Sequence, residues 1–112
     1  MEIKNLKDNG FWLTLSAHDP QISMDLKQLN ELVREKDDCY VIIDFSYAEI
    51  INSSNISNLL ILRSFLEEKG RELILYNVQN ITKCIFVVAG IAEAFVFMDE
   101  DADIRQAIQS TC

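Results

Sequence analysis

Four consecutive small polar residues at positions 52–55, Asn-Ser-Ser-Asn, carry the side chains best suited to chemistry or recognition. They follow the apolar pair at 50–51 and precede residues 56–66, where apolar side chains recur at helical spacing. Ser and Asn oxygens accept hydrogen bonds from the unpaired backbone N–H groups of a first helical turn, so the pattern predicts a helix N-terminus. The positive end of a helix dipole also favours a phosphoryl group. Ser53 and Ser54 are therefore either simple helix caps or sites of a regulatory phosphorylation.

Two acids and one histidine are further candidates. Asp44 ends the apolar run 41–43, as when a buried strand delivers a carboxylate to the end of a sheet. Asp44 is either a structural acceptor of loop N–H groups or part of a recognition surface. Asp19-Pro20 can start a helix, with Asp as the cap and Pro in the first turn. His18 is the only histidine and has no partner at a catalytic or metal-binding spacing, so we expect a solvated loop side chain.

Catalytic patterns are missing from the rest of the sequence. The chain has only three glycines and no phosphate-binding glycine loop or nucleophile elbow. The three cysteines have no metal-like spacing, and the acidic run 99–103 lacks the spacing and glycine of a calcium loop. We therefore expect no enzyme activity, no metal and no cofactor.

The elements that position these residues alternate between strand and helix. The predicted order is a hairpin at 2–7 and 11–15, a helix from 20 to 33, a strand at 40–44, a helix ending near Gly70, a strand at 72–76, a helix after 77–82, a strand at 95–98 and a last helix at 104–109. This alternation predicts one α/β domain over residues 1–112, with a mixed, mostly parallel sheet of four to five strands and about four helices.

The hairpin and the third helix have apolar faces. Asn9-Gly10 between alternating runs predicts the hairpin turn, because both residues tolerate positive φ. Phe11, Leu13 and Leu15 should then face the core, and Trp12 the other side. The other residues expected in the core are Val41, Ile43, Leu59, Leu62, Leu66, Leu73 and Leu75, and in the third helix Ile81, Ile85 and Val88 share a face.

Composition excludes several classes of protein. The 112 residues carry a formal charge of −8, which argues against a nucleic-acid binder and an anionic membrane surface. No apolar run is long enough to span a membrane, so we expect no membrane insertion. An odd number of cysteines without a pairing pattern predicts reduced thiols and a cytoplasmic location. The sequence does not indicate an oligomeric state.

Several motifs in their order resemble those of the STAS domain family, and within it the anti-sigma factor antagonists of bacteria. The similar segments are the strand 41–46 that ends in an acid, the phosphorylation motif at 51–56, the helix 59–66, the strand 70–77 with its polar end, the glycine segment 89–91 and Phe95. The resemblance covers nearly the whole chain, and it implies the same α/β fold.

The resemblance also implies a function. In that family the serine directly after the motif's Asp is phosphorylated by a partner kinase that is also the anti-sigma factor, and the unphosphorylated antagonist binds that kinase and frees a sigma factor. By position the acceptor is Ser53, with Ser54 as its neighbour. Asp19 falls near an acid that the family often has in a loop facing the same surface. The implied partner-binding residues are Asp19, Asp44, Asn52, Ser53, Ser54 and Asn55.

The sequence departs from the family motif at two positions. Asn52 replaces the Asp and Asn55 replaces the Gly. Asn52 keeps the capping geometry but removes a negative charge beside the serine. These departures leave open a STAS domain without phosphorylation, as a small subunit of a transporter ATPase or of a larger signalling complex. An enzyme or small-ligand binder is the weakest hypothesis, because no group of residues supports it.

Overall fold

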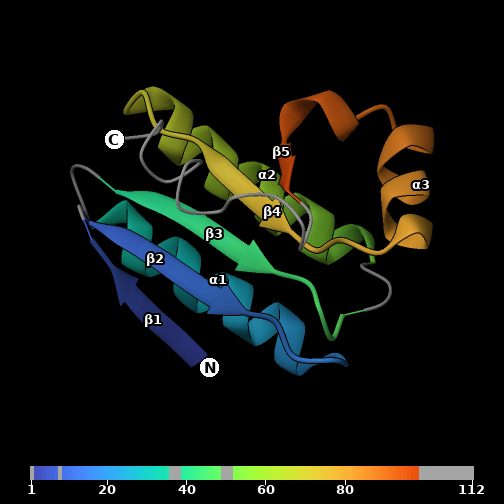
Figure 1. The fold of residues 1–112 in the computed structure, drawn as a ribbon, viewed down its shortest axis with the longest axis horizontal. Helices are drawn as coiled ribbons and strands as arrows, with labels where there is room; N and C mark the ends of the chain where they lie inside the picture. The colour runs from blue at the N-terminus through green and yellow to red at the C-terminus, as the bar shows by residue number, and fades with distance from the viewer. Residues whose placement is uncertain (1, 8, 36–38, 49–51, 99–112) are drawn as a thin grey trace.

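A five-stranded sheet in the order β1-β2-β3-β4-β5 forms the centre of the protein (Figure 1). The computed structural model describes residues 2–7, 9–35, 39–48 and 52–98. The strands are β1 (Glu2–Leu6), β2 (Gly10–Thr14), β3 (Tyr40–Asp44), β4 (Leu73–Tyr76) and β5 (Val96–Met98). β1 is antiparallel to β2, and the other neighbours are parallel. The predicted mixed, mostly parallel sheet with an N-terminal hairpin is confirmed.

Three α-helices connect the parallel strands: α1 (Gln21–Arg34), α2 (Ser53–Glu68) and α3 (Asn80–Val88). A short 3-10 helix, η1 (Ala92–Ala94), precedes β5. Figure 1 shows α1 and α2 side by side behind the sheet and α3 at one side. Each helix joins neighbouring parallel strands, and right-handed crossovers then put all three helices on one face. The predicted fourth helix at 104–109 lies outside the described residues.

The main core lies between α1, α2 and the sheet. Side chains alternate along each strand, so every second residue of β2, β3 and β4 points towards the helices. Residues predicted for the core are buried there: Phe11, Leu13, Leu15, Val41, Ile43, Leu59, Leu62, Leu66, Leu73 and Leu75. The apolar periodicity of the sequence therefore identified this face correctly.

The opposite face of the sheet has its own apolar cluster. Tyr40, Ile42 and Ile74 are buried on this face, and Trp12 and Tyr76 pack against them. The rings of Trp12 and Tyr76 have centroids 5.1 Å apart, although β3 lies between their two strands. The two rings therefore reach across the central strand, and the prediction that Trp12 faces away from the main core is confirmed.

The hairpin turn uses Asn9 and Gly10 for different reasons. Asn9 adopts the positive φ (65°) that the Asn-Gly pattern predicts, whereas Gly10 does not and already pairs in β2. A Cβ atom on Gly10 would lie 2.2 Å from Cζ of Tyr40, which is far inside contact distance. The Tyr40 hydroxyl is held there because it donates to the carbonyl of Lys7 at 2.7 Å. Gly10 is therefore required by the close approach of the Tyr40 ring.

The apolar face of α3 is on the outside. Ile81 and Val88 are 56% and 88% exposed, whereas Thr82 and Phe86 are fully buried. Phe86 packs against Phe95, with ring centroids 5.5 Å apart, and this contact fixes which side of α3 faces the protein. Ile81, Ile85 and Val88 do share a face, but only Ile85 on that face is partly buried and packs against the main core, and the side that is fully buried is the one with Thr82 and Phe86.

Candidate functional site

The start of α2 is capped by Asn52. The backbone of Asn52 is extended (φ −78°, ψ 172°), and its Oδ1 accepts a hydrogen bond from the Asn55 N–H at 3.0 Å. Ser53 and Ser54 are the first two residues of the helix, and both are exposed. Neither hydroxyl makes a side-chain hydrogen bond to the described residues. The interpretation of these serines as the helix caps is therefore wrong, because the asparagine before them takes that role.

Asp19, from the loop between β2 and α1, lies against the same helix start. Asn52 Nδ2 donates to Asp19 Oδ2 at 2.7 Å. Asn55 Nδ2 lies 3.2 and 3.1 Å from the two carboxylate oxygens. Asn55 is buried, so its amide needs these polar partners. The structure thus brings together three of the predicted site residues, although Asp19 lies more than thirty positions before Asn52 and Asn55 in the sequence.

Ser23 completes this network, and sequence reasoning missed it. The Ser23 N–H donates to Asp19 Oδ1 at 3.1 Å. Ser23 Oγ lies 3.0 Å from Asp19 Oδ1 and 2.8 Å from Asn55 Oδ1, and its single proton serves one acceptor at a time. The four-residue spacing of Asp19 and Ser23 is one longer than that of an ordinary cap contact, so residue types and spacing gave no signal for it. The prediction of Asp19 as the cap with Pro20 in the first turn is wrong in its position, because Pro20 holds the N-cap position and α1 begins at Gln21, while Asp19 accepts the Ser23 N–H from one residue earlier.

The Asp19 carboxylate is stabilised by neutral donors. The amide of Asn55 is the main cause that holds the pKa of Asp19 below its ordinary value of 3.8. Burial is the next largest cause and raises the pKa, while Ser23 and Asn52 each lower it by a smaller amount. Hydrogen bonds to the ionised form favour it in this way. No Lys or Arg of the described residues forms an ion pair with Asp19. We refer to Asp19, Ser23, Asn52 and Asn55 as the Asp19 network.

Asp44 lies apart from the Asp19 network. Its Oδ1 accepts hydrogen bonds from the Ser46 N–H at 2.9 Å and the Ser46 hydroxyl at 2.5 Å, and Asn77 Nδ2 donates to the same hydroxyl at 3.0 Å. Asp44 has the same side-chain direction as Ile42, towards the sheet face without described helices. Among the described residues it makes no hydrogen bond with the Asp19 network. Asp44 therefore acts as an acceptor of a loop N–H, as one of its two interpretations requires.

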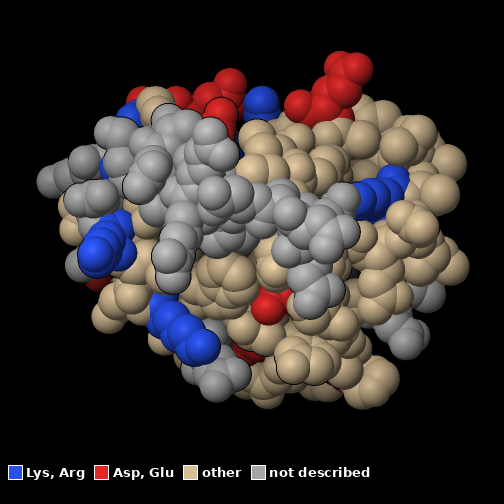
Figure 2. Space-filling view, in the orientation of Figure 1, with Lys and Arg blue, Asp and Glu red and all other residues tan. Residues whose placement is uncertain are grey.

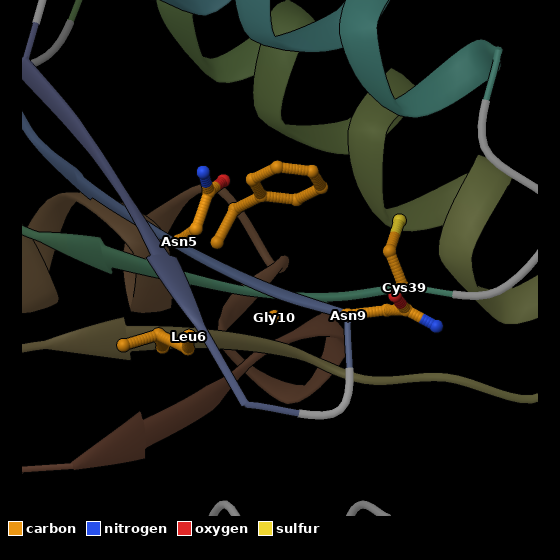
Figure 3. Close-up of a pocket in the computed structure, with 6 residues that line it drawn as sticks. Asn5, Leu6, Asn9, Gly10 and Cys39 are labelled. Carbon is orange, nitrogen blue, oxygen red and sulfur yellow. The ribbon is translucent and has the colours of Figure 1, made fainter.

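The pocket at the hairpin end of the sheet contains none of the candidate site residues. A pocket of about 260 Å³ lies at the hairpin end of the sheet, lined by Asn5, Leu6, Asn9, Gly10, Phe11 and Cys39. In Figure 3 the side chains of Asn5 and Cys39 point upwards, whereas that of Leu6 points to the left and that of Asn9 to the right. The lining side chains therefore do not converge on one point.

His18 is an exposed loop residue, and the described residues contain no group of His, Cys, Asp or Glu side chains able to hold a metal ion.

Comparisons with known proteins identify the fold and the family of this chain. Comparison with curated proteins gives no match. An anti-sigma-factor antagonist (STAS) domain protein from Planctomyces limnophilus has a similar structure, with a TM-score of 0.80 at 14% identity over 98% of this chain and 96% of that chain. A protein from Thermotoga maritima described as an anti-sigma factor antagonist aligns with a TM-score of 0.68 at 10% identity, over 98% and 92% of the two chains. At these identities the likeness shows a shared fold.

No helix in the described part of the chain has the length and apolar character needed to cross a membrane.

Sequence comparison supplies the family. The STAS domain family matches residues 26–107, which are well over half of the chain. The matched residues include most of α1 and the whole of α2 and α3. Together with the fold of its structural relatives, this match establishes that the chain belongs to the STAS domain family.

Proposed function

We propose that this chain is a non-catalytic regulatory module that acts as an anti-sigma factor antagonist and is switched by phosphorylation of Ser53. The partner is an anti-sigma factor serine kinase in the cytoplasm. Its docking surface is the start of α2 together with the Asp19 loop. Membership of the STAS family and the two antagonist-like structures support this role.

The observation that carries the proposal is that Ser53 is exposed and is not the helix cap. Its side chain is exposed at the first position of α2, and Asn52 already caps the helix. The hydroxyl is therefore available to a kinase without the loss of a structural hydrogen bond. A phosphate there would add about −1.5 to −2 charges at a helix N-terminus, which tolerates them. The new charge would act on a partner that must remove water from this surface.

A second candidate function rests on Asn52 and Asn55. Both amides bind the Asp19 carboxylate, so the α2 start and the Asp19 loop are already joined without any phosphate. This arrangement favours a STAS domain that does not switch, for example a small subunit of a transporter ATPase or of a larger signalling complex. Asp44 would belong to the docking surface only if the partner also reaches the far side of the sheet.

The test is capture of the partner from native cell extract, followed by mass spectrometry of the bait after incubation with the captured partner and ATP. We expect phosphate on Ser53, or on Ser54 if the kinase selects the neighbour. Ser53→Ala should bind the partner normally and remain unmodified. Ser53→Asp should weaken binding by roughly tenfold or more, since each tenfold step is about 1.4 kcal/mol and a buried charge easily exceeds that.

Ser64→Asp is the matched control, because Ser64 is exposed in the same helix but lies three turns from its start. It should leave partner binding unchanged. Ser53→Ala should change the free energy of unfolding by less than about 0.5 kcal/mol, as expected for a surface residue that is not the cap. If Ser53→Asp binds as tightly as the native protein and neither serine acquires phosphate, the switch is refuted and the non-switching candidate takes its place.

A further inference from the structure

The outward face of α3 is an apolar stripe. Ile81, Cys84, Ile85 and Val88 recur at the spacing of one helix face. Ile81, Cys84 and Val88 are exposed, with Val88 88% exposed, while Ile85 is partly buried because its inner side packs against the main core. Together with Ala89 they line a shallow hollow of about 390 Å³ that has no polar lining group. The buried side of the helix is held by Phe86 against Phe95 and Phe97, so α3 cannot turn this stripe inwards. An exposed apolar patch of this kind marks a contact surface.

The charge distribution indicates what covers the stripe. The chain carries eighteen acidic and ten basic residues, and α1 and α2 each include two acids. α3 has none, and its one charged residue, Lys83, lies over the ring of Phe97 with 5.9 Å between Nζ and the ring centroid. In Figure 2 the region over α3, at the right, shows one basic side chain among uncharged residues. A second acidic copy can approach this helix without setting acid against acid.

The stripe is also complementary to itself. Its apolar positions, 81, 84, 85 and 88, are separated by three, one and three residues, and this spacing reads the same in both directions along the helix. Two antiparallel copies therefore place Ile81 opposite the partner's Val88 and Cys84 opposite the partner's Ile85. A two-fold symmetric dimer requires a surface that pairs with itself in this way.

We propose that the protein forms a two-fold homodimer through antiparallel packing of its α3 helices, centred between Cys84 and Ile85. A pair of nine-residue helices is a small contact beside the roughly 1,200–2,000 Å² of a typical stable interface, so we expect a weak dimer with a dissociation constant in the micromolar range. The contact does not use the Asp19 network or Ser53. It is therefore independent of the phosphorylation proposed above.

Sedimentation velocity of the full chain over a roughly hundredfold concentration range, which spans a micromolar dissociation constant, tests the dimer. We expect a shift from monomer to dimer in the native protein. Val88→Asp should remain monomeric throughout, because it puts a charge in the interface. Ile61→Asp, an equivalent change at an exposed position of α2, should dimerise like the native protein. Circular dichroism checks that both variants are folded.

Cross-linking tests the proposed geometry. In a Cys112→Ser background, a short bis-maleimide should link Cys84 of two copies, while Cys39 is buried and unreactive. Moving the thiol to exposed Ser64, by Cys84→Ser with Ser64→Cys, should abolish the link. The dimer is overturned if the native protein stays monomeric at all concentrations. The α3 interface is overturned if Val88→Asp dimerises normally or if the Ser64 thiol links equally well.

Discussion

Asn52 has two simultaneous roles at the start of α2, and they explain why an amide is found there. Its Oδ1 caps the helix, while its Nδ2 donates to Asp19. A carboxylate can perform only the first role. The Asn52 amide lies 2.7 Å from the Asp19 carboxylate, so a carboxylate at position 52 would place a second negative charge beside that of Asp19. The departure from the family motif at this position is therefore coupled to the presence of Asp19.

Replacing Asn52 with Asp should destabilise the protein even though it restores the family motif. The cap is retained, but the two exposed carboxylates repel each other, which we expect to lower the free energy of unfolding by roughly 0.5–1 kcal/mol at neutral pH. Urea denaturation measures this change. Adding Asp19→Asn should remove the penalty, and a double-mutant cycle isolates the coupling. Equal stability of Asn52→Asp and the native protein would show that the two side chains are not coupled in solution.

The acidity of Asp19 gives a second prediction. Because the amide of Asn55 is the main cause of its lowered pKa, Asn55→Ala should raise the pKa of Asp19 towards 3.8. The sign for stability follows from linkage. The hydrogen bonds to Asp19 stabilise the native protein at pH values above 3.8, and this contribution is lost as the pH falls through the lower folded pKa. Carboxyl-carbon NMR titration of Asp19 measures the shift, and an unchanged pKa in Asn55→Ala would contradict the network.

Part of this network could be read from the sequence. A helix start within the polar residues 52–55 followed from residue types and periodicity, and the resemblance placed Asp19 near the same surface. The particular bonds could not be predicted, because Asp19 is separated from Asn52 and Asn55 by more than thirty residues. The sequence also offered three candidate caps, and only the backbone direction decides that Asn52 is the one used.

At the scale of elements, the β1–β2 hairpin and β3 are joined by a contact that depends on Gly10. Gly10→Ala should lower the free energy of unfolding by about 1–3 kcal/mol or more, because its Cβ would overlap the Tyr40 ring, which is buried and hydrogen-bonded. Thermal or urea unfolding measures the loss. Gly70→Ala is the control: no atom lies within 4 Å of its Cβ, and only its φ of 71° opposes the change. A smaller effect at Gly10 than at Gly70 would contradict the packing argument.

The strands were the easiest elements to predict, and α3 was the hardest. β3 has the predicted bounds because a continuous apolar run bordered by polar residues has one interpretation in a parallel sheet. α3 carries apolar residues on two faces, one with Ile81, Ile85 and Val88 and one with Phe86. Periodicity alone cannot choose between them. The choice is made by Phe95 and Phe97, which follow later in the chain and pack against Phe86.

The whole molecule has a large charge imbalance. Its formal charge is −8, and Arg63 and Glu67 form a salt bridge at 3.1 Å on α2. The polar contacts of the Asp19 network involve neutral donors, which salt screens weakly. Repulsion between carboxylates spread over the surface is the main electrostatic contribution that salt can change.

The native protein should therefore become more stable as salt is added. Sodium chloride shortens the screening length from about 10 Å at 0.1 M to about 3 Å at 1 M. This weakens the repulsion between distant acids more than it weakens the attraction within a close pair such as Arg63–Glu67. We expect the midpoint of urea unfolding to rise with salt while the slope of the transition stays constant. Exposed Glu68→Lys, which changes the formal net charge from −8 to about −6, should raise the midpoint at low salt and reduce its salt dependence. A midpoint that falls with added salt would mean that attractive pairs outweigh the surface repulsion.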